Sequence, residues 1–507
     1  MKSKSLLEKA REECVALTFD DVRLRTGFSE VMPDDVNIES KFSRNVSLKI
    51  PIVSAAMDTV TEHGLATEMA KLGGLGIIHR SLKPETQATH VARVKHHLNG
   101  LIDTPACIYD NEAVSSIIER KNMMGYHFNT FPVLDREEKL VGIVSGNDLD
   151  FCDDNSKLIN EIMTTNLVTS PKDTTLDEAY EIMKREKKKL LPLITESGEI
   201  AGMYAFSDVK RIKTRSAETY NIDKRSQLRV GAAIGVGDDG IKRAELLCNQ
   251  NVDCVVIDTA HGDTQPVLDT LKEIKKNFPT LDVVVGNVSI GESAKRLADA
   301  GADGIKVGQG PGSICTTRII AGIGRPQVSA IYGCAKSLEQ HEPSPGVYGI
   351  PICADGGLKS SGDIPIAIAA GAHSVMLGSM LAGIEEAPGD IVFTQGRQWK
   401  RYRGMGSMGA METSQGSRER YRQADGGKNQ MIPEGVEGLV LYKGKLDEVI
   451  FQYVGGLRRG MGYVGAKDIE ELREKGDFDR ITPAGFSESH PHDVNITRDS
   501  PNYRQDM

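Results

Sequence analysis

Residues 283–308 read VVVGNVSIGESAKRLADAGADGIKVG, and this stretch decides the fold. It opens with the apolar run Val283–Asn287 and closes with a second one, Gly304–Gly308. Between them, Glu292–Ala300 has apolar residues at the spacing of one helix face, and Gly301 suits the left-handed backbone that ends a helix. Continuous apolar runs are typical of parallel strands that are buried on both faces. The stretch therefore predicts a strand, a helix and a second, parallel strand.

The same alternation recurs along the chain. The candidate strands are Ile50–Met57, Gly74–His79, Val230–Val236, Cys254–Thr259, Val283–Asn287, Gly304–Gly308, Pro351–Asp355 and Ser374–Gly378. The helical patterns between them are Gly64–Leu72, Gly240–Asn249, Pro266–Asn277, Glu292–Ala300, Val328–Leu338 and Gly362–Ala370. This order predicts an α/β fold, a (β/α)8 TIM barrel, with a doubly wound sheet as the alternative. Glycines gather at the carboxyl ends of the strands, where such barrels place their active sites.

A different repeat interrupts the barrel after its second strand–helix unit. Three pairs recur at the same interval: Phe131–Leu134 with Leu191–Ile194, Gly142 with Gly202, and Asp148 with Asp208. We therefore expect three parts: residues 1–97 begin the barrel, residues 98–215 are inserted, and residues 216–507 complete the barrel. The insertion divides into halves 98–155 and 156–215.

The two halves resemble a CBS-domain pair. That resemblance implies regulatory binding of adenine or guanine nucleotides, with a ribose-binding Asp that follows a Ser or Thr by three residues. Ser145 precedes Asp148 in this way, whereas Ala205 precedes Asp208, so the resemblance supports the first nucleotide site better. A structural pair without a ligand is the alternative.

The composition excludes several classes of protein. The chain has 507 residues, of which 39% are hydrophobic, and a formal net charge of -9. This negative net charge gives no reason to expect a nucleic acid or an anionic membrane as a partner. The 8 cysteines form no C-x-x-C pair, which is usual in a reducing compartment. No stretch is long and apolar enough to span a bilayer, so we expect a soluble, cytoplasmic protein.

The run Gly308–Arg318, GQGPGSICTTR, carries the reactive chemistry. Its glycines and proline favour an irregular loop whose backbone can approach a ligand closely. The loop brings the Ser313 hydroxyl and the Cys315 thiol to one small region, which predicts a nucleophile beside an anion site. A buried cysteine that packs as a small hydrophobe is the alternative.

Together with the interrupted barrel, this loop resembles inosine-5'-monophosphate (IMP) dehydrogenases, and the resemblance covers nearly the whole chain. It implies NAD-dependent oxidation of IMP to xanthosine 5'-monophosphate (XMP), on the path to guanine nucleotides. The chemistry suits the residues. Addition of a thiolate to purine C2 makes that carbon tetrahedral, so a hydride can leave, and water must then hydrolyse the thioimidate that remains.

The resemblance also implies the residues that bind IMP. The phosphate would meet Ser313, Gly378, Ser379 and Tyr402, the ribose would meet Asp355, Gly356 and Gly357, and the base would meet Arg403, Gly404, Met405, Gly406 and Glu434. A helix N-cap is the alternative role for Asp355, and a solvated loop carboxylate is the alternative for Glu434.

For NAD, the chain has no G-x-G-x-x-G fingerprint that would indicate a Rossmann site. By resemblance, the dinucleotide lies at the barrel mouth against Asp258, Asn287, Gly308, Gln309 and Gly310, with Tyr463 offered to the adenine of a neighbouring subunit.

Hydrolysis is assigned to a segment rich in Gly, Ser, Gln and Arg, residues 397–435. The resemblance implies a mobile flap in which Arg420 activates water, with Tyr421 and Thr317 to share protons; a surface linker is the alternative. The family also implies K+ held by backbone carbonyls of Gly310, Gly312 and Cys315. A neighbouring subunit would add Glu488, Ser489 and His490 from its C-terminal segment, residues 480–507, which predicts a homotetramer or an octamer.

Two other functions stay open. GMP reductase shares the thiol loop and the barrel but generally lacks the insertion and the Arg-Tyr pair. A nucleotide-sensing regulatory protein on an inactive barrel would not need Cys315, Asp355, Glu434 and Arg420, all of which are present.

Overall fold

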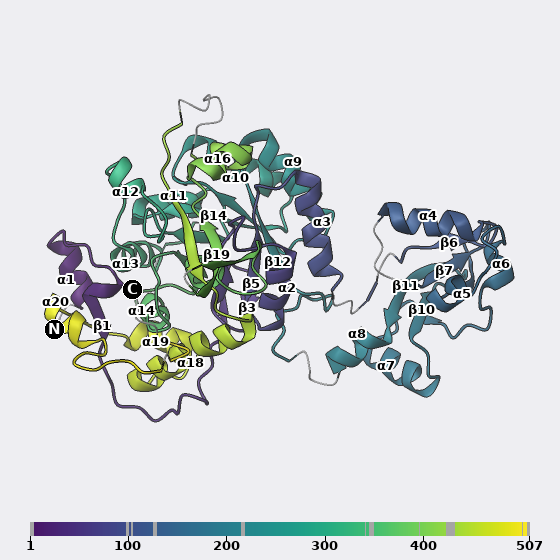
Figure 1. The fold of residues 1–507 in the computed structure, drawn as a ribbon, viewed down its shortest axis with the longest axis horizontal. Coiled ribbons are helices and arrows are strands. Elements are labelled where there is room, and N and C mark those ends of the chain that lie inside the picture. Colours follow the sequence, from purple (N-terminus) through teal and green to yellow (C-terminus); the bar gives the residue numbers. More distant parts are fainter. Residues whose placement is uncertain are drawn as a thin grey trace. The chain divides into compact units, whose positions relative to one another are not determined.

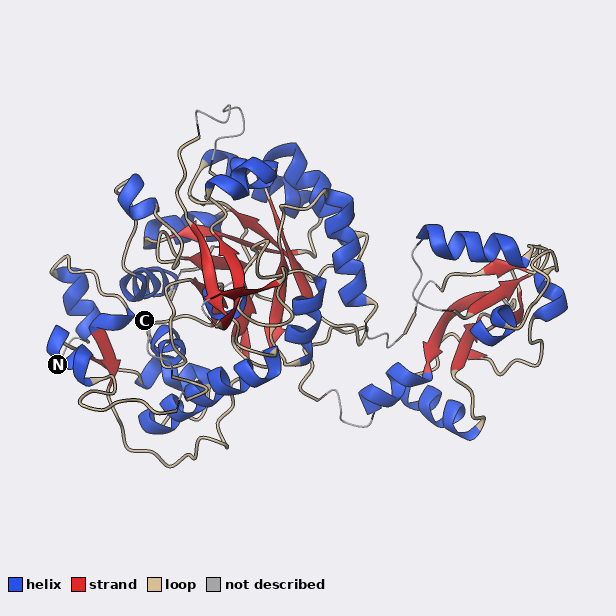
Figure 2. Cartoon of the chain, in the orientation of Figure 1, coloured by secondary structure: helices blue, strands red, loops and turns tan. Residues whose placement is uncertain are grey.

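The computed structural model describes residues 5–97, 101–102, 105–124, 129–213, 218–339, 341–343, 349–394, 396–421, 431–498 and 500–503. The chain divides into two compact units. Unit 1 comprises Met1–Lys95, Thr219–Asn221 and Leu228–Met507, and unit 2 comprises His96–Glu218 and Ile222–Gln227. Figures 1 and 2 show the helices and strands of each unit. The predicted insertion, residues 98–215, falls inside unit 2.

Unit 1 contains a closed barrel of parallel strands in the order β12-β13-β14-β15-β16-β17-β4-β5. The strands are β4 (Ile52–Ser54), β5 (Leu75–Ile78), β12 (Val230–Ile234), β13 (Cys254–Asp258), β14 (Asp282–Val288), β15 (Gly304–Val307), β16 (Ile352–Asp355) and β17 (Ser374–Leu377). All the predicted strands are present. Because β17 pairs with β4 and closes the ring, the TIM barrel is confirmed and the doubly wound sheet is wrong.

Helices surround these strands, as the blue ribbons of Figure 2 show. They are α2 (His63–Lys71), α3 (Pro84–Lys95), α9 (Gly237–Cys248), α10 (Gln265–Asn277), α11 (Gly291–Asp299), α12 (Thr317–Ile320), α13 (Gln327–Leu338), α14 (Asp363–Ala369) and α15 (Ser379–Ala382). Gly301 and Gly371, which follow α11 and α14, have φ of 101° and 118°. Both therefore adopt the left-handed backbone that the sequence predicts at the ends of these helices.

A sheet that the sequence did not predict covers part of the barrel. It is formed by β18 (Ile391–Thr394), β19 (Arg397–Arg403) and β20 (Glu437–Leu441). The expected flap, residues 397–435, therefore begins inside β19 and continues through α16 (Met408–Thr413) and α17 (Gln415–Arg420). Residues 422–430 of the expected flap lie outside the described residues. Because β19 contains several charged residues, its sequence lacks the alternation of apolar and polar residues that indicates a strand. Lys400 and Tyr402 are nevertheless buried.

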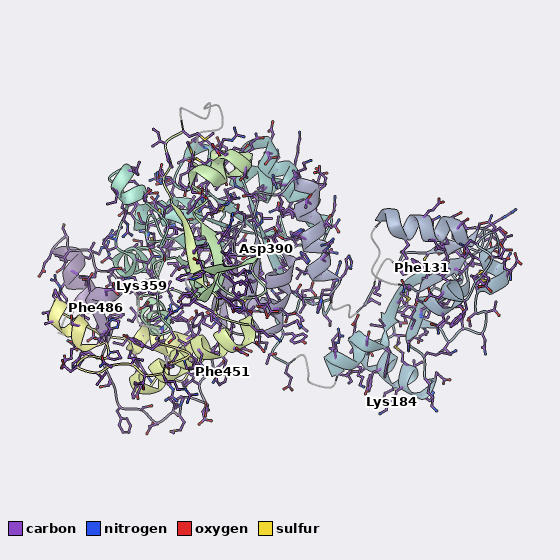
Figure 3. All side chains as sticks on the ribbon, viewed as in Figure 1. Phe131, Lys184, Lys359, Asp390, Phe451 and Phe486 are labelled. Atoms are coloured by element: carbon purple, nitrogen blue, oxygen red, sulfur yellow. The ribbon has the colours of Figure 1, made fainter. Side chains whose placement is uncertain are left out.

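The two ends of the chain meet, because β1 (Val22–Leu24) pairs with β21 (Phe478–Arg480). The remaining elements of unit 1 are α1 (Leu6–Glu12), η1 (Phe19–Asp21), β2 (Ser40–Lys41), β3 (Ser47–Leu48), α18 (Leu446–Val464), α19 (Ile469–Lys475) and α20 (Pro483–Glu488). Figure 3 labels Phe451 on α18 and Phe486 on α20. Phe451 is 75% exposed, so α18 presents an aromatic ring to the outside of this chain.

Unit 2 is built from two similar halves. The first contains β6 (Ile108–Tyr109), α4 (Val114–Met124), β7 (Phe131–Leu134), β8 (Leu140–Val144) and α5 (Gly146–Asp150). The next helix, α6 (Ile159–Ile162), lies beyond the predicted boundary at residue 155, yet its Ile159 packs in the core of the first half. The second contains β9 (Ser170–Pro171), α7 (Leu176–Arg185), β10 (Leu190–Ile194), β11 (Ile200–Ala205) and α8 (Phe206–Lys213). Each half has a parallel pair followed by an antiparallel pair, with a register shift at the same place in the repeat. That these halves form a CBS-domain pair stays a prediction.

In the described part of the chain, no helix combines the length and the apolar character that crossing a membrane requires.

Candidate active site

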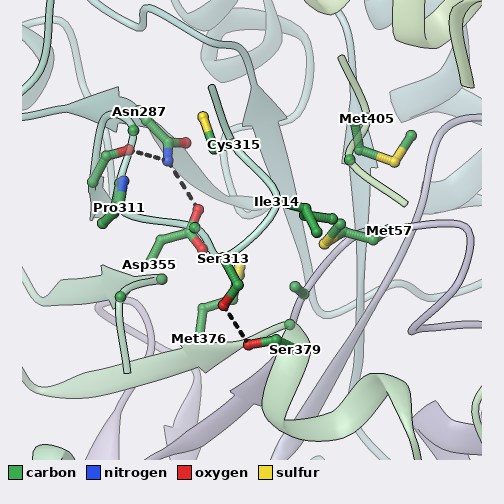
Figure 4. A pocket seen from close by; sticks show the side chains of 18 of the residues that line it. Met57, Asn287, Pro311, Ser313, Ile314, Cys315, Asp355, Met376, Ser379 and Met405 are labelled. Atoms are coloured by element: carbon green, nitrogen blue, oxygen red, sulfur yellow. Dashed lines mark hydrogen bonds between the residues drawn. The ribbon is translucent and has the colours of Figure 1, made fainter. Parts of the chain in front are cut away.

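A cavity opens at the carboxyl ends of the barrel strands, where Asn287 of β14 meets the loops after β4, β13, β15, β16 and β17 (Figure 4). Most of the predicted site residues line it. They are Asp258, Asn287, Gly308, Gln309, Gly310, Gly312, Ser313, Cys315, Thr317, Asp355, Gly356, Gly357, Gly378, Ser379, Tyr402, Gly404, Met405, Arg420, Tyr421 and Glu434. The barrel thus brings together side chains from distant parts of the sequence, although the role of each residue stays a prediction.

Cys315 lies in the loop that leaves β15. Its thiol donates to Thr317 Oγ1 at 3.2 Å, and its backbone N–H donates to the Gly312 carbonyl at 3.0 Å. The backbone also pairs in antiparallel fashion with Gly435, and the Thr316 N–H donates to the Glu434 carbonyl at 3.0 Å. The thiol loop is therefore held by the last residues of the predicted flap, just before β20.

Two other barrel cysteines differ sharply from Cys315. Cys254 and Cys353 are fully buried, and burial raises the pKa of the Cys353 thiol to about 12. Such thiols stay protonated and pack as small hydrophobes. Cys315 is partly exposed in the cavity, so the alternative of a buried structural cysteine is wrong.

Hydroxyl groups gather at another end of the cavity. The Ser313 hydroxyl donates to Ser379 Oγ at 3.0 Å (Figure 4). Tyr402 is only 4% exposed, and its phenol oxygen lies 3.8 Å from Met57 Sδ. Burial raises the pKa of Tyr402, which keeps the phenol protonated as a hydrogen-bond donor. This end of the cavity therefore offers donors to an anion.

A buried lysine that the sequence analysis did not identify joins two carboxylates. Lys306, in β15, is 2% exposed, and its Nζ lies 2.6 Å from Asp355 Oδ2 and 2.9 Å from Asp258 Oδ1. Asn287 contacts this ammonium and donates from Nδ2 to Asp355 Oδ2 at 2.9 Å. The sequence did contain a signal for this residue: Lys306 is the charged residue within an otherwise apolar strand, and a buried lysine normally has a partner.

Asp355 is followed by two glycines that bring the backbone close to the thiol loop. Gly356 and Gly357 have φ of 82° and 86°, where a side chain is strained. A Cβ on Gly357 would also lie 3.1 Å from Pro311 Cβ. Asp355 ends β16 and caps no described helix, so the alternative of a helix N-cap is wrong.

Arg420 enters the cavity from the end of α17. Its guanidinium contacts the Asp258 carboxylate, and the Tyr421 side chain lies beside it. Burial lowers the pKa of Arg420, and burial raises the pKa of Tyr421 while the Arg420 charge opposes that rise. Because α17 places Arg420 in the cavity, the alternative of a simple surface linker is wrong for this part of the segment.

Some predicted residues lie elsewhere in this chain. The Arg403 guanidinium is held by Asp58 at 2.6 Å and lines a different depression. Gly406 is not among the residues that line the cavity, but its carbonyl accepts from the Glu434 N–H at 3.0 Å and so supports the segment that does. Tyr463 is 67% exposed on α18. Glu488, Ser489 and His490 are exposed at and beyond the end of α20.

The residues present fit the two groups that the resemblance implies. Asp258 and Asn287 offer polar atoms beside the thiol loop, as a ribose requires. For a monovalent cation, the Gly312 carbonyl accepts one hydrogen bond, from Cys315, and retains a second lone pair. The exposed Glu488, Ser489 and His490 are accessible to another copy of the chain rather than to this cavity.

The comparisons with known proteins agree with this arrangement. The family described as "IMP dehydrogenase / GMP reductase domain" matches residues 16–492. Inosine-5'-monophosphate dehydrogenases of Aquifex aeolicus and Halalkalibacterium halodurans are each 49% identical to this chain, cover 96% of it, and are themselves covered over 97% and 98%. A solved GMP reductase from Trypanosoma brucei, in complex with guanosine 5'-monophosphate, is 39% identical with a TM-score of 0.83.

That GMP reductase corrects one expectation. The match covers 95% of this chain and 98% of the other, so it extends over the insertion. The insertion therefore does not separate the two activities. What the comparisons share is the family itself: the chain belongs to the IMP dehydrogenase / GMP reductase family.

Proposed function

We propose that this chain oxidises IMP to XMP with NAD, through a covalent adduct on Cys315 that Arg420 helps to hydrolyse. The identity of 49% to IMP dehydrogenases over 96% of the chain supports the overall reaction. The observation that carries the two-step mechanism is the contact of Arg420 with Asp258, beside the Cys315 cavity.

The hydroxyl-rich end of the cavity would hold the phosphate of IMP. Ser313 and Ser379 already share a hydrogen bond, and both can turn their hydroxyl protons to an incoming anion. The protonated Tyr402 phenol adds a third donor. Asp355 would accept from the ribose hydroxyls with Oδ1, because Lys306 and Asn287 occupy Oδ2. Substrate fixed at both points would present its base to Cys315.

In the first step, the Cys315 thiolate bonds to C2 of the purine. The Thr317 hydroxyl, 3.2 Å from the sulfur, would share protons in the hydrolytic step that follows. Bound NAD supplies the acceptor for the hydride that leaves C2. Asp258 is the proposed partner of the nicotinamide-side ribose. Asp258 is also the partner of Arg420. The ribose and the Arg420 guanidinium therefore cannot both bind this carboxylate at the same time.

Because the dinucleotide and Arg420 compete for Asp258, hydride transfer would come before hydrolysis. With the Arg420 helix withdrawn, Asp258 is free for the dinucleotide. With the helix in place, as here, Arg420 lies on Asp258 and the second step becomes possible. Burial lowers the pKa of Arg420, whereas the Asp258 carboxylate favours the charged guanidinium, so Arg420 would act as a base for water only once this contact is relaxed. Tyr421, buried beside it, is placed to share the proton.

Two further parts of the proposal extend beyond one cavity. A potassium ion would be held by the carbonyls of Gly310, Gly312 and Cys315 together with Glu488, Ser489 and His490 of another copy of the chain, within a tetramer or an octamer. Unit 2 would bind a purine nucleotide at Ser145 and Asp148. The Ser145 hydroxyl donates to Asp148 Oδ2 at 2.7 Å, and each of the two side chains also accepts from the backbone N–H of the other residue, which caps α5.

GMP reductase is the second candidate, since the solved relative of that name matches nearly the whole chain. The experiment that separates the two supplies IMP with NAD and follows NADH absorbance, with K+ and with Na+ in its place. We expect NADH with IMP, and a faster rate with K+. Consumption of NADPH with GMP, and no NADH from IMP, would overturn the proposal. The matched control is Cys315→Ala, which should form no NADH.

A further inference from the structure

A group of histidines and one carboxylate lies outside the cavity of Cys315. Glu62 precedes α2, His63 is its first residue, and His90 lies in α3. One ligand atom from each of these three residues lies within 4.8 Å of the other two. His79, which follows β5, lies beside them. None of the described residues that line the Cys315 cavity belongs to this group.

His79 orients the carboxylate. The Ser81 N–H donates to His79 Nδ1 at 3.2 Å, so a neutral His79 ring carries its proton on Nε2. That nitrogen lies 3.5 Å from Glu62 Oε1. His79 is 2% exposed, so its ring cannot turn freely. We conclude that His79 donates to Glu62 and is a positioning residue, not a ligand.

Glu62 is directed away from its own helix. It occupies the N-cap position of α2, yet its side chain makes no capping hydrogen bond. Its carboxylate instead faces the histidines: Oε1 meets His79, and Oε2 lies 4.0 Å from His90 Nδ1.

His90 supplies the second, independent observation. It is 8% exposed, and its Nδ1 is buried with no hydrogen-bond partner. Leaving a buried polar atom unsatisfied costs about 1–3 kcal/mol. The ring of His63 meets that of His90 edge to face, with centroids 4.7 Å apart.

We propose that Glu62, His63 and His90 bind one divalent transition-metal ion, with Zn2+ as the best fit. Two imidazoles and one carboxylate form a donor set typical of zinc, whereas Mg2+ and Ca2+ prefer oxygen atoms alone. Around a tetrahedral zinc with bonds of about 2.0–2.1 Å, ligand atoms lie about 3.3 Å apart. Modest side-chain rotations would bring the three atoms from within 4.8 Å to that separation.

The place of the site in the fold gives it a consequence. The ion would join the start of α2 to α3, and α3 ends at Lys95, where unit 1 gives way to unit 2. His79 is followed by Arg80, which pairs with Glu419 of α17 at 3.0 Å. The ion would therefore fix the segment from which Arg80 holds the Arg420 helix.

Cobalt provides a direct test. The full chain, purified without a histidine tag and freed of metal with a chelator, is titrated with Co2+ and then with Zn2+. We expect one equivalent of Co2+ per chain with the visible absorption of a four-coordinate site, and its displacement by Zn2+. Loss of a positioning residue typically weakens metal binding about 10–100-fold, so loss of a ligand in His90→Ala or Glu62→Gln should weaken it at least about 100-fold.

The matched control is His341→Ala, which removes a histidine that pairs with Asp299 and lies outside the group; it should bind like the wild type. Circular dichroism checks that each variant is folded. If His90→Ala does not fold, Glu62→Gln, which preserves side-chain size, tests whether loss of a ligand weakens metal binding. Absence of a four-coordinate spectrum in the wild type would overturn the proposal. So would equal affinity in the wild type and Glu62→Gln.

Discussion

Lys306 is the residue on which the geometry of the cavity depends most directly. It lies between Asp258 and Asp355, the carboxylates assigned to the two ribose groups. Without the ammonium, two nearby carboxylates would repel each other in a largely buried place. Lys306 therefore both stabilises the barrel and sets where each carboxylate points.

Replacing Lys306 with methionine tests this role. Removing one partner of a buried ion pair costs about 3–5 kcal/mol, and we expect Lys306→Met to lose a comparable amount of unfolding free energy. Binding of IMP should fall with it, because Asp355 loses its orientation. Urea denaturation measures the first effect and calorimetric titration with IMP the second.

Lys336→Met is the control, since Lys336 forms an exposed pair with Glu339 at 2.8 Å. Exposed pairs contribute about 0–1 kcal/mol. Similar losses in Lys306→Met and Lys336→Met would contradict the role given to Lys306.

At the scale of elements, α17 is the part that brings Arg420 to the cavity. Glu419, its neighbour in α17, pairs with Arg80 at 3.0 Å. Arg80 follows β5 and is 6% exposed, and burial, helped by the nearby Arg420 charge, lowers its pKa to about 10. Arg80 stays charged at neutral pH, so the pair holds α17 against the barrel.

We expect Glu419→Gln to weaken this closed position. A hydrogen bond between charged groups contributes about 1.5–3 kcal/mol, so the hydrolytic step should slow about tenfold or more. Hydride transfer, which uses the open position, should be unaffected. Rapid mixing separates the two steps: the first turnover of NADH stays fast, and the steady state slows.

Glu470→Gln serves as the matched control, because Glu470 pairs with Arg473 on α19 at the surface. If Glu419→Gln and Glu470→Gln have the same kinetics, α17 is not held in the way described.

The elements also show what sequence reasoning could reach. The barrel strands were predictable because each is a continuous apolar run with a helix after it. Strand β19 could not be predicted in this way, because its sequence, RQWKRYR, is mostly charged and does not show which positions are buried. Arg403 was assigned to the substrate by its place in a motif, whereas its actual partner, Asp58, lies far away in sequence. Contacts of that kind depend on the closed barrel and cannot be deduced from local spacing.

At the scale of the whole molecule, His373 makes the stability of the barrel depend on pH. Its Nδ1 accepts from the Ile352 N–H at 3.1 Å, which requires an unprotonated nitrogen. Burial lowers the pKa of His373 to about 3, below the value of about 6.5 expected in the unfolded chain. The unfolded state therefore binds the proton more readily.

The contribution of His373 is fully present above about pH 6.5 and is lost as the pH falls toward about 3. Between about pH 7 and 5, the loss should be about 1–2 kcal/mol. His373→Gln, which retains an acceptor but does not titrate, should lose less of its unfolding free energy over this range. Thermal denaturation at several pH values measures the difference.

His492→Gln is the control, because His492 is exposed near the C-terminus. It should follow the wild-type pH profile. Identical acid sensitivity in the wild type and His373→Gln would show that other groups determine it.

Some of the predicted site residues would act only between two copies of the chain. Tyr463 and the segment Glu488–His490 are exposed on unit 1 and do not line the cavity of their own chain; the sequence predicts that they act at the site of a neighbouring subunit. Their proposed roles therefore require a second copy of the protein.

The central claim is that Cys315 forms the adduct and Arg420 helps water to release it. The most direct test mixes Arg420→Ala with IMP and NAD, stops the reaction after one turnover, and examines the Cys315 peptide by mass spectrometry. We predict one equivalent of NADH and a stable adduct on Cys315, with little further turnover. Normal turnover by Arg420→Ala, or NADH formed without any modification of Cys315, would contradict the mechanism.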